Sequence, residues 1–152
     1  MNDDSVKTVT ALCLQYLARR EHSQHELRQK LLAKGISEAL IEPVLMRLQQ
    51  EDWQSDARFA ESFTRQRISK GYGPARIAYE LRQRGVANVA DLLKDDNIDW
   101  DALLEQAYCR KYSASSVLSR KEWAKRSRFL QQRGFDSDMI KRLFRRLPID
   151  LA

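Results

Sequence analysis

The chain has 152 residues, enough for one ordinary domain or for a few small units that share a core. Hydrophobic residues make up 43% and charged residues 32%, which excludes global disorder, and only five Gly and three Pro argue against a turn-rich β sandwich. The formal net charge of +6 comes with 18 arginines and 9 lysines, and it indicates an anionic partner without identifying it.

The sequence offers no sign of secretion or membrane insertion. Residues 1–5 are acidic, unlike the cationic start of a signal peptide, and no apolar run approaches the roughly 18 residues of a membrane helix. Cys13 and Cys109 are too few for a disulfide framework, so we expect reduced thiols. These features predict a soluble cytoplasmic protein.

Three glycines mark an internal repeat of about 50 residues. Gly35, Gly85 and Gly134 are spaced by 50 and then 49 residues. Each follows a basic residue and precedes an apolar one, and a leucine stands four residues before each. This pattern predicts a helix that ends on a left-handed glycine, with a cation near its C-terminus.

Each repeat unit is expected to contain three helices. The first helices are predicted at about 5–20, 56–69 and 100–112 from their apolar spacing. The second helices begin at the capping boxes 23–26 and 119–122, and in the middle unit at Gly73-Pro74.

The third helix of each unit follows its glycine. Apolar residues recur there at i, i+3, i+4 and i+7, which predicts one buried helix face. In the first and third units they are Ile41, Val44, Leu45 and Leu48, and Ile140, Leu143, Phe144 and Leu147.

Two positions depart from this pattern. In the middle unit, two residues are missing after Gly85, so Val89, Leu92 and Leu93 take the first three places and Asp96 the last. That helix is therefore predicted to end early. Pro43 requires either a helix that starts near Leu40 or a bend.

These elements predict an all-α fold of three tandem three-helix repeats, helix-turn-helix-like units in an elongated, curved array. The expected units are residues 1–54, 55–98 and 99–152. The alternative is a single compact domain of nine helices with accidental glycine spacing.

Catalytic and metal chemistry find little support. His22, His25 and Cys13 are too few for a metal site, and the histidines have no partner for a nucleophilic triad. Within the acidic segment 91–105, the sequence from Asp95 resembles the start of a calcium loop. Counted from Asp95, however, the sixth position is Trp100 instead of glycine and the twelfth is Gln106 instead of glutamate. We therefore expect Asp99 to cap the next helix instead. We expect no enzyme, no cofactor and no metal.

Basic residues are concentrated in the second and third units. The net charge is −1 over 1–54, +2 over 55–98 and +5 over 99–152. Two windows, 65–84 and 110–133, each hold a single acidic residue. The candidate binding residues in them are Arg65, Arg67, Lys70, Tyr72, Arg76, Arg82, Arg84, Arg110, Lys111, Lys125, Arg126 and Arg128.

Aromatic residues lie among these bases, a composition that binds single-stranded nucleic acid by charge and stacking. They are Tyr72, Tyr79, Tyr108, Tyr112 and Trp123. The alternative is that Tyr108 and Trp123 belong to the core. The turn 70–74 leads into a helix N-terminus, where free backbone N–H groups could hold a phosphate; a tight inter-helix turn is the alternative.

The segment 55–60, Arg65, the turn 70–74, Ile77, residues 80–81 and Gly85-Val86 resemble the central motif of the RecX family of RecA regulators. Weaker matches flank it and extend the resemblance over about residues 8–148. They are Arg19, Ser23, Glu26-Leu27, Lys30-Leu31 and Gly35 in the first unit, and Lys111-Tyr112, Arg128-Phe129-Leu130 and Arg133-Gly134-Phe135 in the third.

The resemblance implies three three-helix repeats and a negative regulator of the RecA recombinase, acting in DNA recombination, DNA repair and the SOS response. Such proteins bind RecA and lie in the groove of the RecA–DNA filament, block filament extension and suppress ATP hydrolysis, strand exchange and coprotease activity. The resemblance further implies weak, sequence-nonspecific binding to single- and double-stranded DNA. We expect the protein to be a monomer. The alternative function is a stand-alone helix-turn-helix-like DNA-binding regulator.

Overall fold

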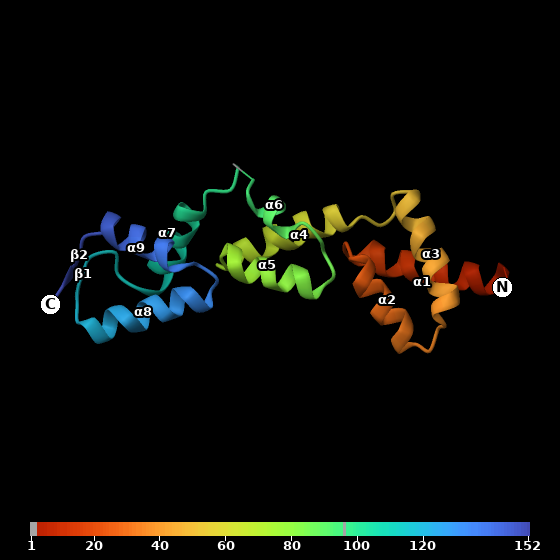
Figure 1. The fold of residues 1–152 in the computed structure, drawn as a ribbon, viewed down its shortest axis with the longest axis horizontal. Coiled ribbons are helices and arrows are strands. Elements are labelled where there is room, and N and C mark those ends of the chain that lie inside the picture. The colour runs from red at the N-terminus through yellow and green to blue at the C-terminus, as the bar shows by residue number, and fades with distance from the viewer. Residues whose placement is uncertain (1–2, 96) are drawn as a thin grey trace. The chain divides into compact units, whose positions relative to one another are not determined.

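The computed structural model describes residues 3–95 and 97–152 and is mostly helical (Figure 1). The helices over these residues are α1 (Asp3–Arg19), α2 (Gln24–Ala33), α3 (Glu38–Gln50), α4 (Asp56–Ser69), α5 (Pro74–Gln83), α6 (Val89–Leu93), α7 (Trp100–Lys111), α8 (Arg120–Gln132) and α9 (Ser137–Arg146). Two short strands, β1 (Ser116–Leu118) and β2 (Ile149–Leu151), accompany them.

Helix starts follow the predicted caps. Ser23 and Glu26 form a complete capping box, in which the Ser23 hydroxyl accepts from Glu26 N–H and the Glu26 carboxylate accepts from Ser23 N–H. Ser119 accepts from Glu122 N–H at the start of α8, but the Glu122 carboxylate accepts from Arg126 instead of closing a box. Asp99 caps α7 through Ala102 N–H, as predicted.

The three repeat glycines adopt the predicted left-handed conformation. Their φ angles are 80° at Gly35, 80° at Gly85 and 106° at Gly134. At each one, the following residue donates its N–H back to the leucine that stands four residues before the glycine, as in Ile36 N–H to Leu31 O (3.2 Å). The repeated spacing therefore marks repeated helix ends.

The third helices differ in two details from the prediction. α3 begins at Glu38, so Pro43 lies inside the helix and not in the first turn of one starting near Leu40. α6 has only five residues and ends early, as predicted, with Val89 and Leu93 buried. Leu92 is 38% exposed, which corrects its expected place in the core, because a helix of one turn and a half buries one narrow face. Asp96 lies outside the described residues.

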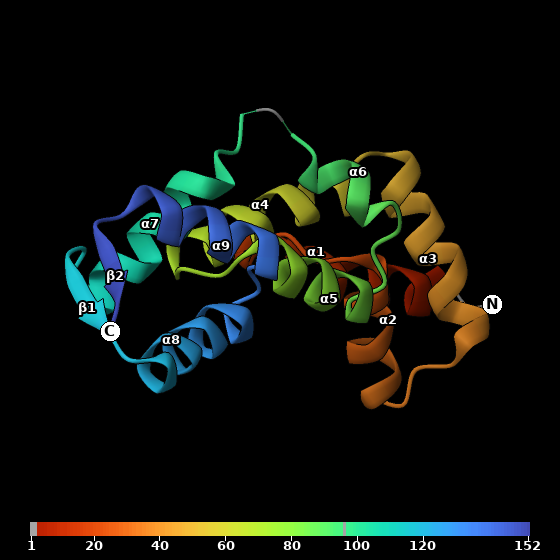
Figure 2. The ribbon, with the colours of Figure 1, turned by 60° about the vertical axis from the view of Figure 1, so that its left-hand side comes forward.

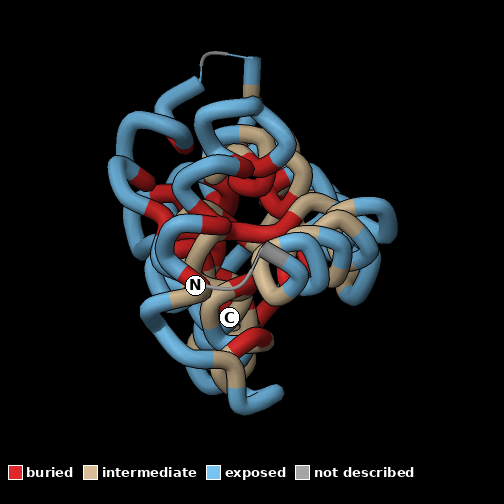
Figure 3. Tube along the Cα trace, turned by 90° about the vertical axis from the view of Figure 1, so that its right-hand side faces the viewer, coloured by how far each residue is buried: buried red, intermediate tan, exposed pale blue. Residues whose placement is uncertain are grey.

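The chain divides into two compact units. The first combines residues 1–63 with 81–88, and the second combines 64–80 with 89–152. Figure 3 shows buried residues in short stretches along the helices, separated by exposed ones. The core of the first unit is formed by one face each of α1, α2 and α3, through Val9, Cys13, Leu27, Leu31, Ile41, Val44, Leu45 and Leu48.

In the second unit, α7, α8 and α9 pack around a core that includes Leu104, Tyr108, Leu130, Phe135 and Leu143. Burying one such leucine stabilises the fold by about 1.5–3 kcal/mol. β1 and β2 lie side by side and parallel, with Ser116 opposite Ile149 (Figure 2). The sequence did not predict this strand pair, because three-residue strands depend on their partner more than on local pattern.

Candidate protein and nucleic-acid interface

The turn 70–74 joins α4 to α5 through a tightly bonded backbone. Gly71 N–H donates to Ile68 O (2.9 Å) and Tyr72 N–H donates to Arg67 O (3.1 Å), which closes the end of α4. Gly71 has a φ of 85°, a conformation that glycine adopts at little cost. Tyr72 is thereby fixed between the two helices.

This turn also docks on the end of α8 within the second unit. Gly73 N–H donates to Arg133 O (2.7 Å) and Ala75 N–H donates to Gly134 O (3.0 Å). A Cβ at Gly73 would lie 2.6 Å from the carbonyl of Gly134, so glycine is required for this approach. These amides are therefore used within the protein, and the tight-turn alternative is the correct one, not a phosphate site on free N–H groups.

Docking of the turn 70–74 on the end of α8 brings residues of both basic windows together. The Tyr72 ring has three guanidinium groups around it, with ring-centroid distances of 4.2 Å for Arg76, 5.0 Å for Arg133 and 5.3 Å for Arg67. We call these four residues the Tyr72 cluster. Arg67 and Arg76 also form ion pairs with Glu80, at 2.8 and 3.5 Å, so part of their charge is compensated.

A second group of cations and rings lies on α7 and α8. The Lys111 ammonium is 4.0 Å from the Phe129 ring centroid, and the Arg126 guanidinium is 4.3 Å from that of Tyr112. We call these four residues the Tyr112 cluster. Arg133 lies 5.3 Å from the Phe129 centroid and so belongs to the surroundings of both clusters. In both clusters each cation lies over an aromatic ring and is attracted to the electron-rich face of that ring.

Arg126 is the most constrained of these cations. It donates to the Tyr108 hydroxyl (2.8 Å) and to Glu122 Oε1 (3.0 Å). Burial acts to lower the pKa of Arg126, but the hydrogen bonds to Tyr108 and Glu122 outweigh it, and the pKa lies above its usual range. Arg126 is thus a permanently charged structural group with its guanidinium over Tyr112.

The structure separates the other candidates. Arg65 on α4 and Lys125 and Arg128 on α8 are exposed. Arg82 and Arg84 belong to the first unit, not to the one that holds these clusters. The Arg84 guanidinium lies 4.6 Å from the Phe63 ring centroid and pairs with Glu26 at 3.7 Å.

The aromatic candidates differ in exposure. Tyr108 is completely buried and Trp123 packs against the same core, so the core alternative is correct for both. Tyr72 and Tyr112 are half-buried and in contact with cations, whereas Tyr79 is 60% exposed.

Two further residues belong to this surface although they are not among the candidate residues named from the sequence. Phe129 is the ring under Lys111, and Arg133 lies between the rings of both clusters. The sequence places Arg133 in the second basic window and before a repeat glycine, but does not single it out as a binding candidate. Phe129 is part of the family resemblance in the third unit, but nothing in the sequence predicts its contact with Lys111.

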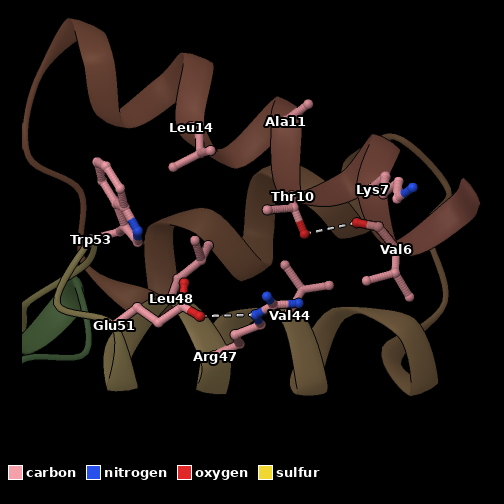
Figure 4. A pocket seen from close by; sticks show the side chains of 10 residues that line it. All are labelled: Val6, Lys7, Thr10, Ala11, Leu14, Val44, Arg47, Leu48, Glu51 and Trp53. Atoms are coloured by element: carbon pink, nitrogen blue, oxygen red, sulfur yellow. Dashed lines mark hydrogen bonds and ion pairs between the residues drawn. The ribbon is translucent and has the colours of Figure 1, made fainter. Parts of the chain in front are cut away.

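The first unit carries an apolar groove of about 380 Å³ between α1 and α3. Side chains of the two helices face each other across it, with Trp53 at one end (Figure 4). The Arg47–Glu51 ion pair, at 3.1 Å, borders the groove, and Trp53 is 58% exposed. The groove was not predicted from the sequence, because its walls come from residues about 40 positions apart.

His22 has a structural role inside the first unit. His22 is buried and bonded on both ring nitrogens, by Arg20 O (3.1 Å) and the Lys30 ammonium (2.8 Å). Among the described residues, no three His, Cys, Asp or Glu side chains gather as a metal site would require.

Within the part of the chain that the structure describes, no helix has the length and apolar character to cross a bilayer.

Comparison with protein families identifies three consecutive domains. The models for the first, second and third three-helix domains of RecX match residues 11–48, 55–89 and 97–144. These matches confirm the predicted all-α repeat fold over the alternative of a single nine-helix domain.

Relatives and solved structures agree with the domain matches. The chain is 42% identical over 142 residues to regulatory protein RecX of Pseudomonas entomophila, covering 92% of each chain. It is 41% identical over 137 residues to that of Halorhodospira halophila, covering 89% of this chain and 85% of the relative. The crystal structure of RecX from Lactobacillus salivarius has the same fold, with a TM-score of 0.78 at 24% identity over 96% of this chain and 98% of that one. The chain therefore belongs to the RecX family of regulatory proteins.

Proposed function

We propose that this chain is a negative regulator of RecA. It binds RecA and lies in the groove of the RecA–DNA filament, where it blocks filament extension and suppresses ATP hydrolysis, strand exchange and coprotease activity. It works by binding and has no catalytic activity of its own. A monomeric state, a cytoplasmic location and three repeats bounded near residues 54 and 98 are part of this proposal.

The observation that supports it most directly is the joining of the two basic windows. The Tyr72 and Tyr112 clusters put cations from α4, α5, α7 and α8 on one compact unit. A concentrated field of one sign attracts polyanions and acidic protein surfaces and accelerates their encounter. Weak, sequence-nonspecific binding to single- and double-stranded DNA follows from the same charges.

The test is RecA-catalysed ATP hydrolysis on single-stranded DNA with increasing amounts of this protein. We expect hydrolysis to fall, most strongly when the protein is present while the filament grows. The double variant Lys125→Glu/Arg128→Glu reverses two exposed charges on α8 and should inhibit less. Lys141→Glu/Arg145→Glu, on exposed positions of α9, makes the same charge change outside the candidate residues and should inhibit as the wild type does. Unchanged hydrolysis at stoichiometric excess of wild-type protein would refute the proposal.

The alternative of a stand-alone DNA-binding regulator predicts a different titration. A sequence reader binds one selected duplex far more tightly than random ones, through contacts to base edges. A filament-groove protein should bind random duplexes equally and lose affinity steeply with salt. Titrating random and selected duplexes at two salt concentrations separates the two, and strong selectivity would favour the alternative.

A further inference from the structure

A small basic pocket in the second unit is lined in part by residues of both clusters. It has a volume of about 170 Å³ and is formed by the turn after α4, the last turns of α7 and the end of α8. Its lining residues are Lys70, Gly71, Ala107, Arg110, Lys111, Phe129 and Arg133. Two of these, Gly71 and Ala107, are the smallest residue types, and a Cβ at Gly71 would be in ordinary van der Waals contact with Arg110 Nη1, at 3.8 Å. Small residues at these places keep the pocket open.

The charge of the pocket is uncompensated. Four of its lining residues are cations and none is acidic. Among the described residues, no carboxylate forms an ion pair with Lys70, Arg110, Lys111 or Arg133. The neighbouring Arg67, Arg76 and Arg126 do have carboxylate partners. Cations held together in a concave site repel one another, and an anion that enters the site relieves this repulsion.

Two of the four cations are held in place without an anion. The Arg133 guanidinium lies between the Tyr72 and Phe129 rings, at 5.0 and 5.3 Å from their centroids, and donates to Lys70 O (3.3 Å). The Lys111 ammonium stays 4.0 Å from the Phe129 centroid. Positioning these groups in advance reduces the entropy lost when a ligand binds. Lys70 and Arg110, the other two, are exposed.

The size and donors of the pocket select the ligand. Its volume equals that of about five or six water molecules at about 30 Å³ each, which accommodates a phosphate group. Guanidinium groups donate paired hydrogen bonds to phosphate oxygens, and ammonium groups add point charges. A strand of phosphates also suits the further exposed cations, Lys125 and Arg128, that the same unit carries.

We propose that this pocket binds one backbone phosphate of single-stranded DNA. The proposal rests on the proposed function for the identity of the ligand, because phosphate chemistry alone does not name its source. A single strand is flexible enough to turn one phosphate into a recess, whereas a duplex bends only at considerable cost. The pocket thus sets where the strand is held on the second unit.

The test is binding of a fluorescently labelled oligodeoxythymidylate to the full chain, without RecA, over a range of salt concentrations. Lys70→Gln/Arg110→Gln should lower affinity at least tenfold at low salt and should reduce the slope of log affinity against log salt by about 0.7, the value for one phosphate on a single strand. The control Lys141→Gln/Arg145→Gln removes the same charge from α9 and should change affinity less than twofold. Circular dichroism of both variants checks that they fold.

Equal losses in the pocket and control variants would overturn the proposal, since general charge would then explain the binding. Unchanged oligonucleotide binding in Lys70→Gln/Arg110→Gln with lost binding to DNA-free RecA would also overturn it, because the pocket would then hold a protein carboxylate. The wild type could also bind the oligonucleotide, and lose this binding in Lys70→Gln/Arg110→Gln, yet leave ATP hydrolysis by RecA unchanged. That result would support the pocket and refute the proposed function. The two proposals therefore fail separately.

Discussion

His22 shows how the fold accommodates a polar ring inside the first unit. The Arg20 carbonyl can only accept, so Nδ1 of His22 carries the proton and Nε2 accepts from the Lys30 ammonium. Burial lowers the pKa of His22, and the positive charges of Arg20 and Lys30 act in the same direction. The folded protein therefore binds a proton at His22 less readily than the unfolded chain does.

This arrangement predicts acid sensitivity beginning near pH 6.5, the ordinary pKa of histidine. Below that pH the unfolded chain binds a proton at His22 more readily than the folded chain does, so stability falls as the pH falls. Glu26 has a lowered pKa, because hydrogen bonds from Arg20 and Ser23 N–H outweigh its burial, and it adds a further loss only below its ordinary value of 4.5. Urea unfolding of wild type and His22→Gln at pH 7.5 and 5.5 measures the effect. An equal loss of stability in both proteins would contradict this assignment.

The two cysteines should differ in reactivity. Cys13 is completely buried, and burial raises the pKa of its thiol to about 11, whereas Cys109 is exposed on α7. We expect one fast-reacting thiol with a disulfide reagent at pH 8, and none in Cys109→Ser until the chain unfolds. Two fast thiols in the wild type would mean that α1 is not packed as described.

At the scale of elements, glycine spacing predicted the helix ends but not the contacts between them. Gly35, Gly85 and Gly134 follow one local rule, and all three have positive φ. The approach of Gly73 to Gly134 joins residues 61 positions apart, and no local pattern records it. Helix bounds depend on local sequence and were therefore predictable, whereas the β1–β2 pair depends on a contact between distant residues and was not.

This difference gives a matched test on two repeat glycines. At Gly35 a Cβ would have open space, with no atom within 4 Å, so only the backbone strain of its φ of 80° remains. Gly35→Ala should therefore lower the free energy of unfolding by only about 1–2 kcal/mol. At Gly134 a Cβ would lie 2.6 Å from that of Arg76 and 2.7 Å from its backbone nitrogen. Gly134→Ala should therefore cost more, about 3 kcal/mol or above, and should disturb the turn 70–74 as well. Urea midpoints measure both, and equal costs would show that the approach is not needed.

Across the whole molecule, the sequence showed in which segments the cations are concentrated, but not which of them are available to bind a partner. Counting charges identified both basic windows, and the docking of the turn 70–74 on the end of α8 brings residues of both windows together in the second unit, without Arg82 and Arg84. Arg67 and Arg76 pair with Glu80, and Arg126 pairs with Glu122, so the formal charge overstates what a partner meets. The pairs at i, i+4 can be guessed from spacing. Arg67 with Glu80, and Arg133 between two rings, require the tertiary packing.

The arginines and lysines of the basic windows should therefore fall into two classes. Glu80 is 12% exposed at its side chain, and Arg67→Gln removes its nearer cation, at a cost of about 1–3 kcal/mol in stability. Lys125→Gln changes an exposed group and should shift stability by less than about 0.5 kcal/mol, yet it should weaken filament binding in a way that vanishes as salt rises. Thermal unfolding and filament binding at two salt concentrations test both variants. If Lys125→Gln destabilised the fold, or if Arg67→Gln left it unchanged, the division of this charge into structural and binding groups would be wrong.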